Sequence, residues 1–305
     1  MAGFALFSIL DAIVKALGDT YSSFQIVFFS ALLGFPLTAI VLIRDRADST
    51  LLPVHPWWMA LRTGAVTLTG VSAFYAFTVL PLAQTYAIIF ATPLLITILS
   101  IPVLGEVVHR RRWLAVTAGL VGVLVVLRPG GTELGLGHLA ALGTAVGGAL
   151  NSIIIRKIGH EEKSGVLLLY PMVATVILMG CILPFVYRPM PASDLGGFTL
   201  IAVLGFLATL SLIVAYRKGE AVVMAPMQYS QILWATAFGA MFFDELPDRY
   251  TIVGATIIIA SGLYLLFRES RAGASQHTPV LNTRSRSIPT SGLRISTILR
   301  RSSNR

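Results

Sequence analysis

The chain contains an internal repeat, and this repeat constrains its fold more than any other feature. The stretch from Asp11 to Arg128 recurs 140 residues later as Asn151 to Arg268. Each copy closes on an acidic turn, Gly105-Glu106 and then Asp244-Glu245, followed by one more apolar run. A repeat of this length predicts two copies of one structural unit that pack against each other.

The composition places both copies in a membrane. Of the 305 residues, 55% are hydrophobic and only 12% are charged, and the mean hydropathy is +0.80. The charges gather in short clusters separated by about 20 residues, the length that crosses a hydrocarbon core of about 30 Å. The runs between them do not alternate apolar and polar residues, so helices rather than barrel strands are expected. The sequence thus predicts an all-α polytopic membrane protein.

Ten transmembrane helices are predicted, five in each copy. The first copy with its flanks covers residues 1–130, the second covers 135–268, and a basic tail covers 269–305. Five is an odd number, so the second copy enters the bilayer upside down, as in transporters built from inverted repeats. The predicted spans are 3–18, 24–43, 57–79, 83–103, 112–128, 138–157, 165–187, 195–216, 222–243 and 250–267.

The basic residues of the loops predict the orientation. The even-numbered loops hold ten of them: Arg44, Arg46, Arg110, Arg111, Arg112, Arg156, Lys157, Lys163, Arg217 and Lys218. The odd-numbered loops hold three: Arg128, Arg188 and Arg249. The positive-inside rule therefore predicts that both termini of the ten-span chain are cytoplasmic. A cleaved signal peptide is not expected, because no basic region or small-residue cleavage site precedes Asp11 and Lys15.

The net charge of +9 does not predict binding to nucleic acid, because eight of the 23 Lys and Arg residues lie between Arg268 and Arg305 and most others lie in membrane loops. The tail is rich in Ser, Thr and Arg, so we expect it to be disordered. It is either a solubilising extension or a segment that lies on anionic lipid. The single Cys181 excludes an internal disulfide and offers no metal cluster.

Several motifs resemble the EamA domain of the drug/metabolite transporter (DMT) superfamily. In the first copy these are Tyr75-Ala-Phe-Thr-Val-Leu-Pro-Leu-Ala-Gln-Thr-Tyr, Leu104-Gly-Glu and Leu127-Arg-Pro-Gly. In the second copy, Ala225-Pro-Met-Gln-Tyr and Asp244-Glu-Leu-Pro-Asp carry the resemblance. It covers about residues 3–268.

The resemblance implies a permease of the bacterial cytoplasmic (inner) membrane that works by alternating access. Its central cavity would be lined by the first, third, fourth, sixth, eighth and ninth spans. The chain is most similar to the branch that takes up riboflavin and S-adenosylmethionine, and exporters of amino acids and metallophores are near relatives. A small polar or aromatic metabolite is therefore the expected partner, with no cofactor.

Asp11 and Lys15 are the first candidate site residues. They lie four residues apart and so share one face of the first span. A carboxylate near the middle of a membrane is costly unless it is paired or hydrated, which makes it a functional candidate. In the alternative interpretation, Lys15 extends to the outer interface and Asp11 is a satisfied structural partner.

The ninth span carries the second group of candidates: Gln228, Tyr229, Gln231 and Trp234. Gln228, Gln231 and Trp234 are spaced by three residues and are predicted to share one face. Rings can stack on a flat solute and amides can bind its polar edges. The alternative is hydrogen bonding between helices. Further candidates in other spans are Tyr75, Tyr86, Thr92 and Asn151.

Structural or gating roles are predicted for Glu106 and Glu245 at span ends and for Pro93 and Pro226 inside spans. The two glutamates are expected to pair with loop bases such as Arg110 or Arg249, or to cap helix ends. The prolines can loosen their helices. Gly143 and Gly147 form a GxxxG pattern, which permits close packing either within the bundle or between the subunits of a homodimer.

Enzymes, pumps and channels are disfavoured. The five histidines are scattered over loops and tail, and no serine has an identifiable base partner. The sequence contains no phosphate-binding loop for ATP and no His-Glu-x-x-His run. Channels tend to show filter motifs or rings of charge, which this sequence lacks.

Overall fold

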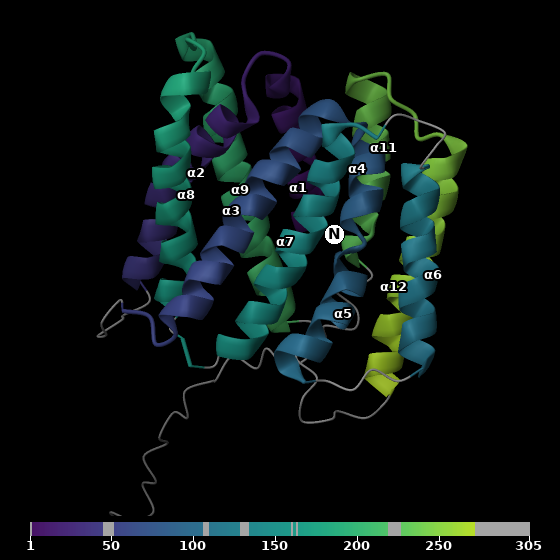
Figure 1. Cartoon of the computed structure of the whole chain (residues 1–305). Helices are drawn as coiled ribbons and strands as arrows, with labels where there is room; N and C mark the ends of the chain where they lie inside the picture. The colour runs from purple at the N-terminus through teal and green to yellow at the C-terminus, as the bar shows by residue number, and fades with distance from the viewer. Residues whose placement is uncertain are drawn as a thin grey trace, which may run out of the picture.

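The computed structural model describes residues 2–44, 52–105, 110–128, 134–159, 161–162, 164–218 and 227–271, and within them every element is an α-helix. The first repeat contains α1 (Ala2–Gly18), α2 (Ser23–Arg44), α3 (Pro56–Val79), α4 (Leu82–Ile89), α5 (Thr92–Leu104) and α6 (Arg110–Leu127). The second contains α7 (Leu136–Ile158), α8 (Ser164–Val186), α9 (Ala192–Lys218), α11 (Ser230–Phe242) and α12 (Arg249–Arg271). Since α4 and α5 together fill the place of the fourth span, the described helices account for the ten predicted spans (Figure 1).

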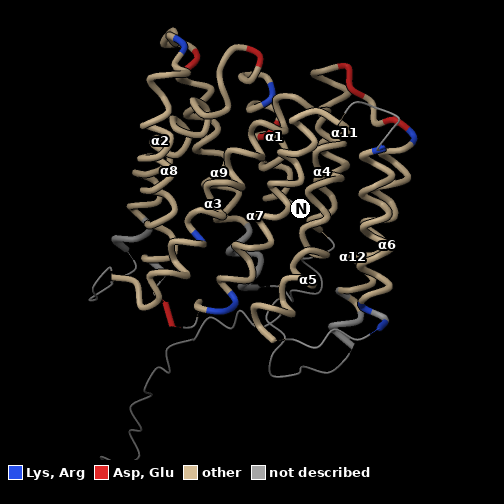
Figure 2. Tube along the Cα trace, viewed as in Figure 1, with Lys and Arg blue, Asp and Glu red and all other residues tan. Residues whose placement is uncertain are grey.

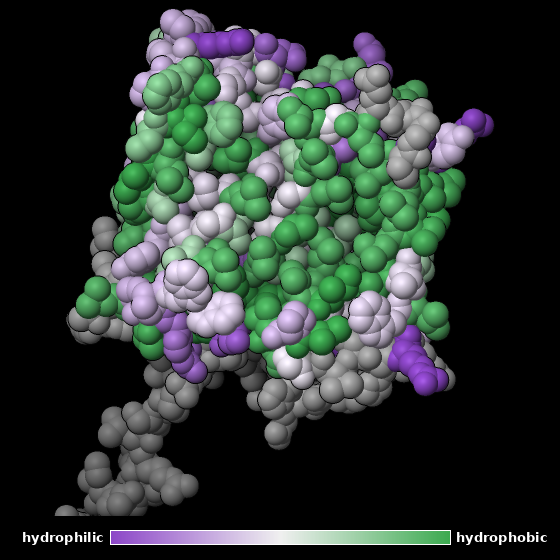
Figure 3. Space-filling model, in the orientation of Figure 1, coloured by the Kyte–Doolittle hydropathy of each residue, from purple (hydrophilic) through white to green (hydrophobic). Residues whose placement is uncertain are grey.

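The helices form a polytopic membrane bundle. By length and hydropathy, five stretches of the described chain are able to cross a membrane: Ser23–Ile40, Leu82–Leu104, Leu136–Ile158, Val166–Val186 and Ala192–Ser211. Arg112–Leu127 and Arg249–Leu265 are shorter apolar helices. In Figure 3, hydrophobic residues cover much of the middle of the visible face, and hydrophilic residues gather mainly toward its two ends. The helix α12 continues to Arg271, four residues beyond the predicted end of the tenth span, and the rest of the tail lies outside the described residues.

Successive turns alternate between the two ends of the bundle. The α1–α2, α3–α4, α8–α9 and α11–α12 turns lie at the upper end in Figure 1, and the α7–α8 connection lies at the lower end. Described acidic residues gather at the upper end in Figure 2 together with a few basic ones. This alternation is the arrangement that five spans per repeat require.

The fourth span is not one continuous helix. The helix α4 ends before Phe90, which caps it, and α5 begins at Thr92, with Pro93 in its first turn. Proline has no N–H, so Pro93 leaves the carbonyl of Ile89 without its helical partner. The Thr92 hydroxyl donates to that carbonyl at 2.6 Å instead. Pro93 therefore interrupts the span at its centre, and the Thr92 hydroxyl satisfies the carbonyl that Pro93 leaves without a helical partner. The other proline predicted to loosen a span, Pro226 in the ninth span, lies outside the described residues.

The packing follows the inversion of the repeat. The pairs α1 with α9 and α7 with α3 are equivalent under exchange of the two repeats, and both pack extensively. The pairs α6 with α12 and α2 with α8 each exchange with themselves and stand at opposite sides of the bundle in Figure 1. The main hydrophobic core is formed by α1, α3, α4, α7, α9 and α11 together with residues of α2, α6 and α12.

The predicted GxxxG pattern lies inside the bundle, against α3. A Cβ on Gly147 would meet Thr69 Oγ1 at 2.5 Å and the Ala65 carbonyl oxygen at 2.9 Å. A Cβ on Gly143 would meet Ser72 Oγ at 3.1 Å. Of the two interpretations of this pattern, the structure shows the packing within one chain.

Candidate functional site

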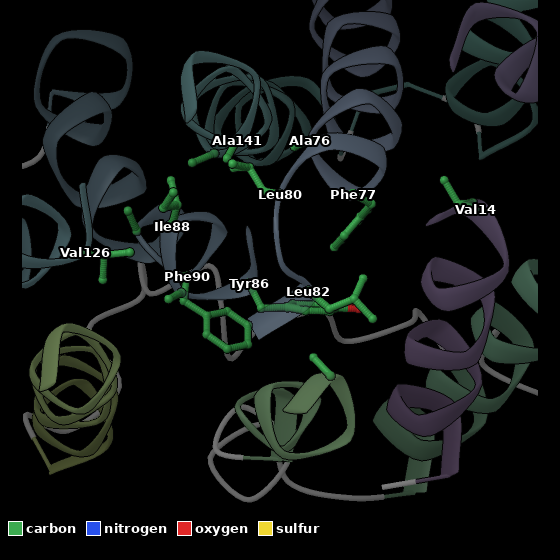
Figure 4. Packing of buried hydrophobic residues seen from close by; sticks show 14 of the residues in the cluster. Val14, Ala76, Phe77, Leu80, Leu82, Tyr86, Ile88, Phe90, Val126 and Ala141 are labelled. Atoms are coloured by element: carbon green, nitrogen blue, oxygen red, sulfur yellow. The ribbon is translucent and has the colours of Figure 1, made fainter. Parts of the chain in front are cut away.

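The most buried polar cluster near the centre of the molecule joins α1, α4 and α11. The Tyr86 hydroxyl donates to Asp11 Oδ2, and Gln231 Nε2 lies 3.5 Å from the same hydroxyl oxygen. Asp11 is 8% exposed, Tyr86 4% and Gln231 9%. In Figure 4 the Tyr86 side chain points from α4 toward α1, which carries Val14. The cluster places one carboxylate, one phenol and one amide where three helices from both repeats meet.

A row of aromatic rings continues this cluster. Phe77 of α3 lies 5.3 Å from Tyr86 between ring centroids, and Tyr86 lies 5.8 Å from Phe90. Phe90 in turn meets Tyr229 edge to face at 5.1 Å. Aromatic surface beside a carboxylate and an amide suits a flat solute that also carries polar or cationic groups.

Phe90 and Tyr229 occupy equivalent positions in the two repeats. Aligning Glu106 with Glu245 offsets the repeats by 139 residues, which brings Phe90 opposite Tyr229. Phe90 is the C-cap of α4, and Tyr229 is the N-cap of α11. Both repeats are therefore interrupted at the same point, and the two interruptions contact each other. Sequence analysis selected Tyr229 but missed Phe90, although the repeat alignment pairs them.

Lys15 and Glu245 form a second cluster one helical turn along α1 from Asp11. Lys15 Nζ lies 2.8 Å from Glu245 Oε1 and donates to the Leu80 carbonyl at 2.7 Å. The other Glu245 oxygen accepts the backbone N–H of Leu82, the first residue of α4, at 3.3 Å. The predicted capping role of Glu245 is thus present, but its cation is Lys15 rather than Arg249, because the α11–α12 turn folds over the end of α1. Lys15 extends to the turn at this end of the bundle but stays buried there: it is 8% exposed and held within this cluster.

The other predicted residues do not join these clusters. The predicted common buried face of Gln228, Gln231 and Trp234 does not form: the ninth span is interrupted at Tyr229, after Gln228, and Trp234 lies toward the exposed side of α11. Gln231 is buried, Gln228 is exposed, and Trp234 is 37% exposed and stacks on Phe238. The buried Tyr229 hydroxyl has no hydrogen-bond partner among the described residues, and it lies where a Cβ on Gly262 would be.

Residues of α3, α5 and α7 flank the central cluster. Thr92 caps the broken span and lies against Gly148 of α7. The Asn151 side-chain oxygen is buried without a hydrogen-bond partner, and Tyr75 is partly buried. Glu106 lies outside the described residues. Among the residues that the structure describes, no group of three His, Cys, Asp or Glu side chains could hold a metal ion.

Comparison with known proteins gives a consistent result. The model of the EamA-like transporter family matches residues 1–128 and again residues 135–268. The chain is 27% identical over 277 residues to an S-adenosylmethionine uptake transporter of Rickettsia prowazekii, covering 88% of this chain and 92% of the relative. It is 25% identical to a pseudopaline exporter of Pseudomonas aeruginosa, covering 85% of this chain and 91% of the relative.

Two further similarities extend this comparison. A riboflavin transporter of Rhizobium johnstonii is 25% identical over 240 residues, covering 78% of this chain and 80% of the relative. A solved crystal structure superposes with a TM-score of 0.59 at 18% identity, covering 89% of this chain and 97% of that chain. The structural similarity shows a shared fold.

Proposed function

This chain belongs to the EamA-like transporter family of the drug/metabolite transporter superfamily, and from that premise we propose that it is a secondary transporter for a cationic, aromatic metabolite of the S-adenosylmethionine type. It is a multi-pass membrane transporter and not an enzyme. The proposal concerns its cargo, its site and its mechanism.

The observation that carries the proposal is the buried carboxylate of Asp11 beside a row of aromatic rings. A carboxylate inside a membrane protein is stabilised by a cation, and aromatic faces also attract cations. S-adenosylmethionine combines a sulfonium cation with a flat adenine ring. Asp11 would meet the cation, Tyr86 and Phe90 would contact the ring, and the Gln231 amide would bind its polar edge.

The interrupted spans support an alternating-access mechanism. The breaks at Phe90 and Tyr229 leave both repeats without continuous helix hydrogen bonding at the point where they touch. Transporters with inverted repeats bind substrate at such discontinuous helices and rock one repeat against the other. The relatives named above include both an uptake transporter and an exporter, so a flux assay should follow both directions.

Ligand-dependent thermal stability of the purified protein tests the site. A ligand present at about 100 times its Kd stabilises the folded state by about 2.7 kcal/mol. We expect S-adenosylmethionine to raise the melting temperature of the wild type and of Gln228→Ala, whose side chain is exposed. Gln231→Ala makes the same chemical change at a buried position and should abolish the rise.

The variant Asp11→Asn removes the charge of this side chain and keeps its shape. The amide can still accept the Tyr86 hydroxyl, but it no longer attracts a cation, so the response to S-adenosylmethionine should fall. Any response to the uncharged riboflavin should remain. Equal responses of Gln228→Ala and Gln231→Ala, or an undiminished response of Asp11→Asn to S-adenosylmethionine, would remove this cluster from the site. Saturable flux of the ligand into or out of proteoliposomes tests transport itself.

A further inference from the structure

The helix pair α6 and α12 stands at one side of the bundle and bears a groove that the transport mechanism does not use (Figure 1). The two helices run antiparallel and cross very closely. A Cβ on Gly122 would lie 2.9 Å from the Gly254 carbonyl oxygen, and a Cβ on Gly254 would lie 2.6 Å from that of Gly122. Only glycines permit this approach, and the larger side chains beside the crossing form the walls of the groove.

Two hollows lie along this pair. The first has a volume of about 600 Å³ and lies at the end of the bundle where α6 ends and α12 begins; it is lined by Leu124, Val125, Arg128, Arg249, Tyr250 and Val253. The second, of about 470 Å³, lies further along the same helices, beside Ala118, Ile257 and Tyr264. Leu124 is 54% exposed and Val253 51%. In a membrane protein, apolar side chains exposed in this way contact lipid.

The mouth of the first hollow carries positive charge. The Arg128 guanidinium pairs with Asp248 and lies 3.8 Å from the centre of the Tyr250 ring. Arg249 lies 5.0 Å from the same ring centre, with Nη2 3.5 Å from the Tyr250 hydroxyl. Across the described residues, no carboxylate pairs with Arg249. The mouth of the first hollow therefore carries two guanidinium groups and one carboxylate. Of these groups, Arg249 is the cation that can bind an anionic ligand.

We propose that this groove is a binding site for one anionic phospholipid, with the phosphate at Arg249 and Arg128 and an acyl chain along the α6–α12 groove. Arginine and tyrosine are suited to phosphate and to the interfacial region of a bilayer. From Arg249 to Ala260 the helix rises about 16 Å, close to half of a hydrocarbon core of about 30 Å. One acyl chain of a single leaflet thus extends past the first hollow and reaches the second.

Lipid retention measured by native mass spectrometry tests this site. The full-length protein is reconstituted into vesicles of equimolar phosphatidylglycerol and phosphatidylcholine, extracted in detergent and examined for bound lipid. We expect the wild type to retain phosphatidylglycerol over phosphatidylcholine by about fivefold, the ratio that corresponds to about 1 kcal/mol for one basic residue near an anionic surface. Arg249→Gln should remove this preference, and Arg249→Lys should restore part of it.

Two further variants serve as controls. Arg188→Gln removes an exposed arginine at the same end of the bundle but away from the groove, and it should keep the wild-type preference. Val253→Trp fills the groove and should lower retention of both lipids. If a thermal melt shows that Val253→Trp has a folding defect, Val253→Leu is measured in place of that variant.

Three outcomes would overturn the proposal: equal retention of the two lipids by the wild type, equal losses in Arg249→Gln and Arg188→Gln, or conversion of a dimer to a monomer by Val253→Trp. The last would identify the groove as an interface between two copies. Because the lipid site is independent of the central cluster, any of these results leaves the proposed cargo untouched.

Discussion

Single side chains donate hydrogen bonds to backbone carbonyls that prolines inside the spans leave without a helical partner. Pro171 removes the N–H that would bond the Leu167 carbonyl, and Arg62 Nη1 donates to this carbonyl from α3. Thr92 does the same within its own helix for the carbonyl that Pro93 leaves free. An unsatisfied carbonyl in a membrane costs several kcal/mol. The hydrogen bond from the buried Arg62 therefore stabilises α8 at this point. Arg62 did not emerge from sequence analysis, because its partner lies 105 residues away.

A hydrogen bond made by the α1–α2 turn predicts a dependence on pH. The Tyr21 hydroxyl, in the α1–α2 turn, donates to Asp194 Oδ2 at 2.5 Å, at the start of α9. This bond is the largest cause that raises the pKa of Tyr21 from 10.0 to about 12, because the carboxylate favours the protonated phenol. A folded-state pKa above the unfolded value means that the stabilisation is complete below pH 10 and is lost as the pH rises toward 12.

Thermal unfolding of the wild type and of Tyr21→Phe measures this effect. We expect the wild type to be more stable by a constant margin from neutral pH to about 10 and the margin to shrink from there to about 12. The phenylalanine variant keeps the ring, which packs edge to face on Phe198. A margin that does not change with pH would contradict the assignment of this hydrogen bond.

The helices show the repeat in their irregularities as well as in their order. Gly105 and Asp244 are equivalent at the offset of 139 residues, and both follow the second part of an interrupted span. Both also adopt a left-handed backbone, with φ of 70° and 54°. Glycine takes this conformation without cost, and aspartate is among the few other residues that tolerate it. The two acidic turns that first marked the repeat thus each begin at a residue with a left-handed backbone.

The close contact of α3 and α7 predicts which glycines tolerate a methyl group. Gly147→Ala places its Cβ against Thr69 Oγ1 and the Ala65 carbonyl. The Thr69 hydroxyl already donates to that carbonyl at 2.7 Å, so neither group can move aside freely. We expect a loss of about 1–3 kcal/mol of stability, the usual cost of overpacking.

Gly70→Ala is the matched control for this change. Gly70 lies on α3, and a Cβ there has nothing within 4 Å. Alanine favours a helix over glycine by about 1 kcal/mol, so this variant should be as stable as the wild type or more so. Melting temperatures of the two purified variants provide the comparison, and a Gly147→Ala protein as stable as Gly70→Ala would disprove the predicted clash.

The two repeats of the whole molecule are joined by helix packing, by polar contacts at both ends and by an aromatic contact at the centre. At the upper end, Lys15 joins α1 to the α11–α12 turn, and Gln25 joins α2 to the backbone of Arg188. At the centre, Phe90 meets Tyr229. A rocking movement that opens the upper end would have to break the contacts of Lys15 and Gln25 while it pivots near Phe90 and Tyr229.

The orientation of this molecule in the membrane is a prediction at this scale. We propose that the end bearing Arg110 is cytoplasmic and that the end bearing Asp19 faces outward, because basic loop residues are concentrated on the cytoplasmic side. Single cysteines at these two exposed positions, in a Cys181→Ser background, test it in intact cells. A maleimide that does not cross membranes should label Asp19→Cys at once and Arg110→Cys only after permeabilisation. The reverse pattern would invert the topology.

Periodicity and local charge were sufficient to predict the helices. Apolar runs of about 20 residues, prolines at turns and the repeat of the acidic turns each depend on neighbouring residues, so the ten spans and their inversion followed from them. The GxxxG pattern predicted close packing of its helix, but only the structure showed that the partner is α3 of the same chain.

The assembly of the site depended on contacts between distant helices. Asp11 meets Tyr86 and Gln231 because α1, α4 and α11 converge, and Lys15 pairs with Glu245 because a turn folds over its helix. The interruption at Tyr229 separates Gln228 from the helix that carries Gln231, and Trp234 lies on the exposed side of that helix. Hydrogen bonds and ion pairs require particular distances in space, and helical spacing specifies which residues share a face but not which helix that face will meet.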